Sequence, residues 1–126
     1  MFGTYQHSQL RLETNASAQQ LAAALTQTDQ LRQWLWPQRL SQGLPQHLTP
    51  GLQFTSWTGP VAVQHQVEQL VPNGIRLTLS QGIDGFHEWS WGHGWVQSRL
   101  EGITLLPLNL GQTFTLLRLQ AFLRQS

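Results

Sequence analysis

The sequence predicts an α+β fold in which one strand is followed by two short helices, five or six antiparallel strands and a C-terminal helix. Three observations predict it. Apolar residues at helical spacing are confined to residues 18–36 and 110–124. Residues 51–104 instead alternate apolar with polar side chains, and glycine, proline and asparagine divide them at short turns. Short turns imply an antiparallel meander, so we expect a curved sheet with the terminal helix lying in its concavity.

The composition restricts the class of protein. The 126 residues are 40% apolar, which suits a single domain spanning residues 1–126. Only 10% are charged, and the chain contains 19 glutamines and no lysine. A net charge of +1 without a basic cluster argues against nucleic-acid binding. Zero cysteines exclude disulfides and thiol catalysis, and no apolar run is long enough for a membrane span or a signal peptide, so we expect a soluble cytoplasmic protein.

The first predicted elements are a strand and a helix. Residues 4–14 alternate leucine with polar residues, as a half-buried strand does. Ser17 and Gln20 then fit a capping box, in which two side chains satisfy free amides at the start of a helix. The helix formers that follow predict a helix over residues 18–26.

A second helix start is predicted directly afterwards. Thr28 and Asp29 suit the first turn, and Pro37 should end the helix because proline disfavours helical geometry in the residue before it. Residues 38–50 have no clear period, since glycine and prolines interrupt their leucines. We interpret this segment as a short strand or an irregular crossing.

The remaining strands are predicted from alternation of period two. They comprise residues 52–57, 61–68, 75–80, 86–91 and 95–103. A final helix is predicted over about residues 110–124, with Asn109 and Gln112 as a second capping box. Its expected inward stripe consists of Leu110, Phe114, Leu117 and Ala121, widened by Leu116, Leu119 and Leu123.

Four short sequence motifs, taken in their order along the chain, resemble those of one protein superfamily. They are the helical segment Ser17–Trp34, the Pro-Gly and aromatic strand Thr49–Phe54, the strand and turn Val67–Gly74, and the Trp-x-Trp strand Glu88–Trp91. The chain resembles the START-related, pollen-allergen-like helix-grip superfamily, which includes polyketide cyclases and activators of the heat-shock chaperone ATPase. The resemblance implies an internal apolar cavity that binds a hydrophobic small molecule such as a lipid, an isoprenoid or a polyketide. It implies no shared catalytic residue and no cofactor.

The candidate ligand contacts are side chains expected on the inner face of the sheet and helices. They are Trp34, Phe54, Val63, His65, Leu77, Leu79, Trp89, Trp91, Phe114 and Leu117. Two interpretations of the tryptophans remain open. They form an aromatic cavity wall that stacks a ligand, or they fill the core of a small domain.

The titratable residues also allow two interpretations each. His65 shares its predicted strand face with valines, and is either a hydrogen-bonded core residue or a polar ligand contact. Glu88 either takes part in acid–base chemistry beside His65 or Arg99, or forms a cross-strand ion pair with Arg99. His87 and His93 lie across a turn without a third ligand at suitable spacing, so we expect no metal site.

Three functional hypotheses follow. We favour hydrophobic ligand binding without catalysis. A cyclase or dehydratase would need at least two polar side chains that converge in the cavity, and His65, Glu88 and Arg99 are its candidates. An interaction module of the chaperone-activator kind would need an exposed apolar patch, for which Trp36 and Trp95 are candidates.

Overall fold

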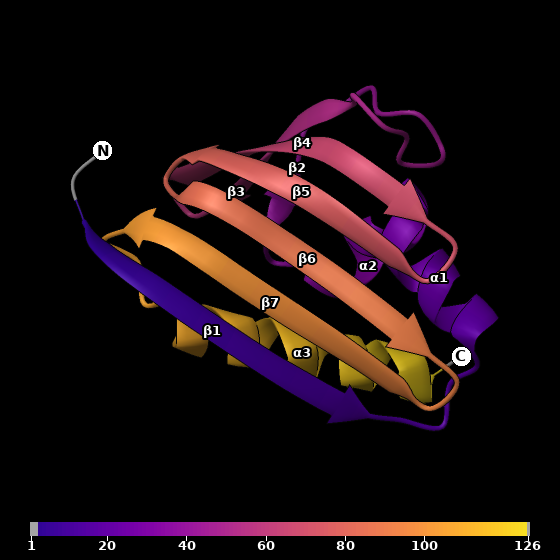
Figure 1. The fold of residues 1–126 in the computed structure, drawn as a ribbon. Coiled ribbons are helices and arrows are strands. Elements are labelled where there is room, and N and C mark those ends of the chain that lie inside the picture. The colour runs from indigo at the N-terminus through magenta and orange to yellow at the C-terminus, as the bar shows by residue number, and fades with distance from the viewer. Residues whose placement is uncertain (1–2, 126) are drawn as a thin grey trace.

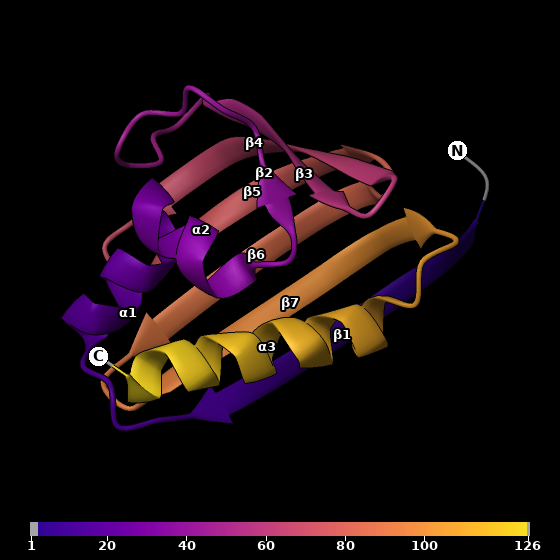
Figure 2. The same cartoon turned by 180° about the vertical axis from the view of Figure 1, so that it is seen from behind.

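The computed structural model describes residues 3–125, and these form a curved antiparallel sheet with three helices on its concave side (Figures 1 and 2). The seven strands lie in the order β1-β7-β6-β5-β4-β3-β2. They are β1 (Thr4–Glu13), β2 (Arg39–Leu40), β3 (Gln53–Thr58), β4 (Val61–Val71), β5 (Gly74–Gln81), β6 (Asp84–Gly92) and β7 (Trp95–Thr104). The helices are α1 (Ala18–Thr26), α2 (Thr28–Leu35) and α3 (Leu108–Arg124).

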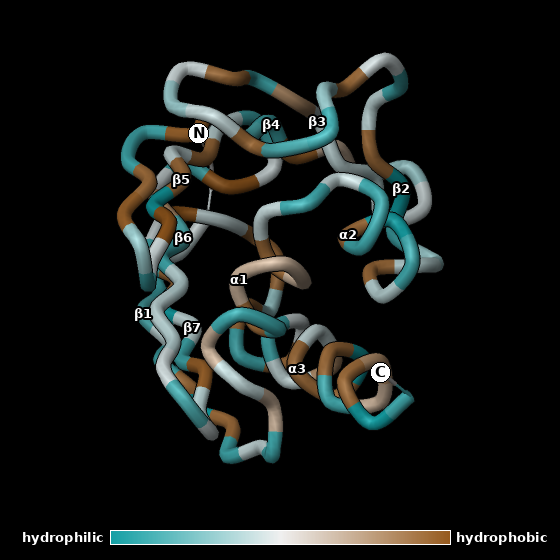
Figure 3. The backbone as a smooth tube through the Cα atoms, turned by 90° about the vertical axis from the view of Figure 1, so that its right-hand side faces the viewer, coloured by the Kyte–Doolittle hydropathy of each residue, from teal (hydrophilic) through white to brown (hydrophobic). Residues whose placement is uncertain are grey.

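This architecture confirms the predicted α+β class and the predicted order of elements. Strands β2 to β7 form a meander in which each strand pairs with its neighbour in sequence. β1 departs from that rule, because it pairs with β7 from Thr4 opposite Thr104 to Glu13 opposite Trp95. In Figure 3, β1, β7, β6 and β5 lie on one side of the molecule, and the sheet curves through β4 and β3 to β2, which lies beside α2 on the other side. No helix within residues 3–125 is long and apolar enough to cross a membrane.

The predicted start of α1 is confirmed in detail. Ser17 Oγ accepts a hydrogen bond from the Gln20 backbone N–H at 3.1 Å, and Gln20 Oε1 accepts one from the Ser17 N–H at 2.8 Å. These bonds satisfy two amides that have no partner within the helix. α2 begins at Thr28 and ends at Leu35, just before Pro37, as the sequence predicts.

Trp34 ties α2 to α1. Its buried indole donates a hydrogen bond from Nε1 to the Ala24 carbonyl at 2.8 Å. Trp34→Phe should therefore lower the free energy of unfolding by about 1–3 kcal/mol, because a buried carbonyl loses its partner and the smaller ring leaves space. Trp36→Phe is the matched control, since Trp36 is 71% exposed. Urea denaturation that shows equal effects for the two variants would contradict this assignment.

The inner face of β6 carries its odd-numbered residues. Trp89 and Trp91 are buried, whereas Glu88 lies on the outer face and directly opposite Arg99. Glu88 Oε1 lies 3.8 Å from Arg99 Nη1, and Glu88 Oε2 lies 3.3 Å from Arg76 Nη1. The structure thus confirms the cross-strand ion pair. All three side chains are part-exposed, so each pair contributes about 0–1 kcal/mol.

The predicted inward stripe of α3 is partly wrong. Leu110, Phe114 and Leu117 are 54%, 53% and 53% exposed, and Ala121 is exposed too. Leu116, Leu119 and Leu123, which were expected to widen the stripe, are buried as predicted, together with Leu108 and Gln112. Leucines occur at helical spacing on more than one side of this helix, so the apolar pattern alone does not fix its rotation.

The second capping box is also wrong, and its two residues explain the rotation of α3. The helix begins two residues earlier than expected, after Pro107, and no side chain caps it. Asn109 Nδ2 donates to Ser8 Oγ at 2.9 Å, and Gln112 Nε2 donates to the Ser98 carbonyl at 2.8 Å. Polar contacts with β1 and β7 therefore turn the Gln112 side of the helix inward, where burial without partners would be costly.

Candidate functional site

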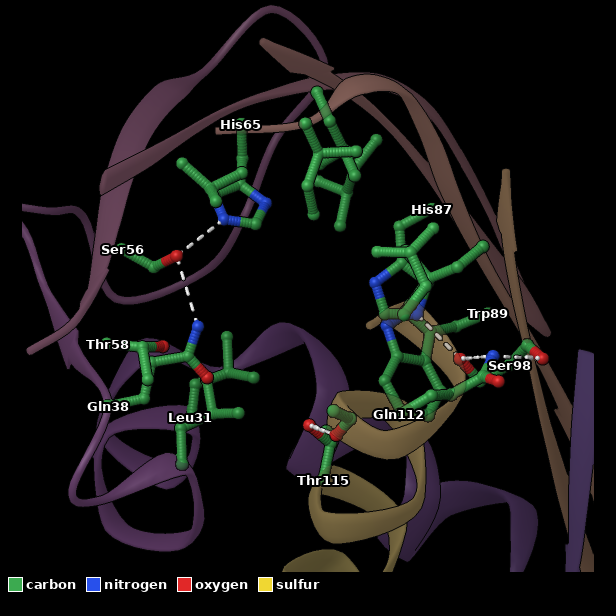
Figure 4. A pocket seen from close by; sticks show the side chains of 18 of the residues that line it. Leu31, Gln38, Ser56, Thr58, His65, His87, Trp89, Ser98, Gln112 and Thr115 are labelled. Carbon is green, nitrogen blue, oxygen red and sulfur yellow. Dashed lines mark hydrogen bonds between the residues drawn. The ribbon is translucent and has the colours of Figure 1, made fainter. Parts of the chain in front are cut away.

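A cavity of about 310 Å³ lies between the concave face of the sheet and helices α2 and α3 (Figure 4). Strands β3 to β7 supply its walls, and most of the side chains that line it are apolar. This volume falls within the range of small-molecule sites, about 300–1,000 Å³. The lining residues that are exposed to solvent are Thr58, Pro107, Gly111 and Phe114, so the mouth lies between the end of β3 and the first half of α3.

The structure brings together most of the candidate ligand contacts named from the sequence. The lining includes Trp34, Phe54, Val63, His65, Leu77, Leu79, Trp89 and Phe114. Two candidates are placed elsewhere. Trp91 is buried in the core at the end of β6 where α1 packs, and Leu117 lies on the outer side of α3. Trp34 and Trp89 therefore line the cavity, whereas Trp91 fills the core.

His65 faces the cavity from β4, as its alternation with the valines predicts. It lies opposite Phe54 in the register of β3 and β4, and the two rings stack with their centroids 4.8 Å apart and 6° between planes. Its Nε2 is 2.9 Å from Ser56 Oγ, which accepts a hydrogen bond from Gln38 Nε2 at 3.1 Å. His65 Nδ1 is buried and has no hydrogen-bond partner among residues 3–125.

His87 is a second inward-facing histidine, and it was not predicted as a ligand contact. Its Nε2 lies 2.7 Å from Ser98 Oγ on the neighbouring strand β7, and its ring packs on Trp89 at 4.7 Å (Figure 4). The signal was present, because His87 is two residues before Trp89 and so shares its strand face. Gln112 was missed as well, because the rotation of α3 was misjudged.

Burial governs the electrostatics of both histidines. It lowers the pKa of His65 to about 4 and that of His87 to about 3, with a smaller lowering of the latter by His65. Both imidazoles are therefore neutral at neutral pH. Among the residues that line the cavity, Arg118 supplies the charged side chain, and burial lowers its pKa. Its Nε is buried without a hydrogen-bond partner in the described chain.

No metal site accompanies these groups. Within residues 3–125, no three side chains of histidine, cysteine, aspartate or glutamate come together in a way that could hold a metal ion. The cavity instead presents a mainly apolar surface with a few neutral hydrogen-bonding groups and the Arg118 guanidinium, which suits binding of an uncharged or amphipathic organic molecule.

Comparison with known proteins identifies solved structures that share this fold. No family model and no curated protein sequence matches the chain. Among solved structures, protein MLL2253 from Mesorhizobium loti has a TM-score of 0.72 at 13% identity, with 96% of this chain and 98% of that one covered. The Aha1 dimer from Colwellia psychrerythraea has a TM-score of 0.68 at 16% identity, with coverages of 94% and 96%.

DynU16, a protein of the dynemicin biosynthetic locus, is similar over 94% of this chain, with a TM-score of 0.69 at 16% identity. This chain spans about half of that protein, since 47% of DynU16 is covered. These likenesses show that the chain has the helix-grip fold, so the resemblance found in the sequence is confirmed at the level of the fold.

Proposed function

We propose that this protein, as one helix-grip domain over residues 1–126, binds a hydrophobic small molecule in its internal cavity without catalysing a reaction on it. The observation that carries the proposal is a cavity of about 310 Å³ lined mainly by apolar side chains. A ligand that buries about 200 Å² of apolar surface there would gain ~5 kcal/mol from the hydrophobic effect before the costs of association. A lipid, an isoprenoid or a polyketide-like molecule has this chemistry.

The proposed contacts divide by their position in the cavity. Trp34, Trp89 and Phe54 offer aromatic faces, and Val63, Leu77 and Leu79 line the sheet side. Phe114 stands at the mouth, half-exposed. His65 and His87 contribute polar atoms to an otherwise apolar wall. Trp91 and Leu117 are left out of the proposed site because neither lines the cavity.

Two observations favour binding over cyclase or dehydratase chemistry. Glu88 and Arg99 form their ion pair on the outer face of the sheet, so His65 is the one member of that candidate set that lines the cavity. His65 and His87 have pKa values of about 4 and 3. A general acid or base works best with a pKa near the operating pH, so these imidazoles are poorly matched to proton transfer at neutral pH.

The interaction-module hypothesis has partial support. Trp36 is 71% exposed, and Leu110 and Leu117 are each more than half exposed on the outer side of α3. Trp95 is less available, because the Arg11 guanidinium lies 4.6 Å from its ring centre. Nothing in the structure shows what would cover the exposed residues, whereas the cavity has the size and lining of a ligand site. We therefore retain small-molecule binding as the proposed function.

Uptake of an apolar probe tests this proposal. Purified protein incubated with fluorene, an uncharged three-ring hydrocarbon, should give a complex of one fluorene per chain in native mass spectrometry. Fluorene should also displace an environment-sensitive dye from the protein. The proposal fails if neither complex formation nor displacement occurs up to the solubility limit of the hydrocarbon.

A further inference from the structure

We propose that the ligand carries a hydrogen-bond acceptor, such as a carbonyl oxygen, that binds the Nδ1–H of His87 inside the cavity. This inference rests on the proposed binding function and adds the chemical class of the ligand to it. It follows from the direction of the hydrogen bonds that run from α3 through β7 to His87 (Figure 4).

The orientation of the Gln112 amide is fixed first. Its Nε2 lies 2.8 Å from the Ser98 carbonyl oxygen and 3.3 Å from the Ser8 carbonyl oxygen. A carbonyl oxygen only accepts hydrogen bonds, so the amide atom between them must be the NH₂ donor. The other amide atom, Oε1, accepts from Ser8 Oγ at 2.5 Å.

The amide then sets the direction of the next bonds. Gln112 Nε2 also lies 2.9 Å from Ser98 Oγ and, as an NH₂ donor, cannot accept the proton of that hydroxyl. Ser98 has one hydroxyl proton left to donate, and His87 Nε2 at 2.7 Å is the acceptor that the structure provides. His87 Nε2 therefore carries no proton, and the neutral ring holds its proton on Nδ1.

The protonated edge of His87 faces the cavity. The imidazole lines the cavity and remains partly accessible, and Figure 4 shows the ring edge away from Ser98 turned to the interior. Burial holds the pKa of His87 near 3, so the ring stays neutral and keeps this single proton arrangement. An N–H donor in apolar surroundings is costly without an acceptor, and a ligand oxygen would supply one.

Arg118 supplies a second donor to the cavity, because a guanidinium only donates hydrogen bonds. His65 Nδ1 and Arg118 Nε are both buried without a hydrogen-bond partner in residues 3–125. Arg118 therefore also favours a ligand that bears a hydrogen-bond acceptor.

A matched pair of probes tests the inference. Fluorene and 9-fluorenone share one ring skeleton, and fluorenone adds a carbonyl acceptor. We expect fluorenone to bind the wild-type protein about tenfold more tightly than fluorene, as measured by calorimetry or dye displacement. Ser98→Ala removes the donor that keeps His87 Nε2 unprotonated, so it should reduce this preference to within about twofold. Ser90→Ala, the same change on the opposite face of β6, should keep the preference.

Two further measurements make the test decisive. His87→Phe keeps an aromatic ring against Trp89 and should abolish the preference for fluorenone even where Ser98→Ala folds poorly. The histidine side-chain ¹⁵N spectrum of the wild-type protein should show Nδ1 protonated and Nε2 unprotonated for His87. The reverse assignment, or equal binding of the two probes, would overturn the inference while the proposed function stands. Failure of both probes to bind would instead count against the proposed function.

Discussion

Acidification from about pH 7 to about pH 4 should lower the free energy of unfolding by several kcal/mol, because two buried histidines resist protonation. The folded-state pKa values of His65 and His87 are about 4 and 3, below the ordinary value of 6.5. Below about pH 6.5 the unfolded chain therefore binds more protons at these two histidines than the folded chain does. The contribution of the neutral histidines to the free energy of unfolding is fully present above that pH, and it is lost as the pH falls toward the folded-state pKa values.

The expected loss of unfolding free energy on acidification is large enough to detect easily. Each unit of pKa difference corresponds to about 1.4 kcal/mol, and typical proteins have only about 5–15 kcal/mol of net stability. Urea denaturation at a series of pH values measures the slope directly. His87→Phe should remove a large part of the slope between about pH 6 and pH 4. His7→Gln is the matched control, since His7 is exposed on β1. A slope that His87→Phe leaves unchanged would show that His87 is not a buried neutral imidazole.

Substitution of Gly111 should separate ligand binding from stability. Gly111 lies in α3 at the mouth of the cavity, and a Cβ added there meets no atom within 4 Å. Gly111→Ala should raise the free energy of unfolding by about 0.5–1 kcal/mol, because glycine is the less favourable residue inside a helix. Gly111→Trp adds an indole at the mouth, where it competes with the ligand for space, and should weaken fluorene binding roughly tenfold or more.

Gly111→Ala is the control for Gly111→Trp, because it changes the helix backbone without adding bulk at the mouth. Fluorene titration should therefore give near wild-type affinity for Gly111→Ala and a large loss for Gly111→Trp. Thermal denaturation should show that both variants remain folded. Equal fluorene affinities for the two variants would place the binding site away from this cavity.

Local chemistry explains the parts of the fold that the sequence predicted well. The capping box of Ser17 and Gln20 and the stop at Pro37 each depend on residues within one or two helical turns. The alternation through β3 to β7 also depends on neighbouring residues. It placed His65 on the face of the valines, and it put Trp89 and Glu88 on opposite faces of β6 without deciding which face points inward. Such features follow from hydrogen bonding and burial within one element.

The parts that were missed depend on contacts between distant segments. Ser8 on β1, Ser98 on β7 and Gln112 on α3 meet only because β1 pairs with β7 and α3 packs across them. These three side chains fix the rotation of α3, which a helix with leucines on several sides does not specify by itself. The same contacts determine which nitrogen of His87 carries the proton. The spacing of residues along the sequence therefore could not predict that the site offers a hydrogen-bond donor there.

Intermolecular NOEs from fluorene to assigned methyl groups show whether an apolar small molecule binds inside the cavity. We expect a saturable complex with NOEs to Leu77, Leu79 and Leu100, which line the interior. NOEs confined to Leu110 and Leu117, on the outer side of α3, would contradict binding inside the cavity, as would the absence of any saturable binding.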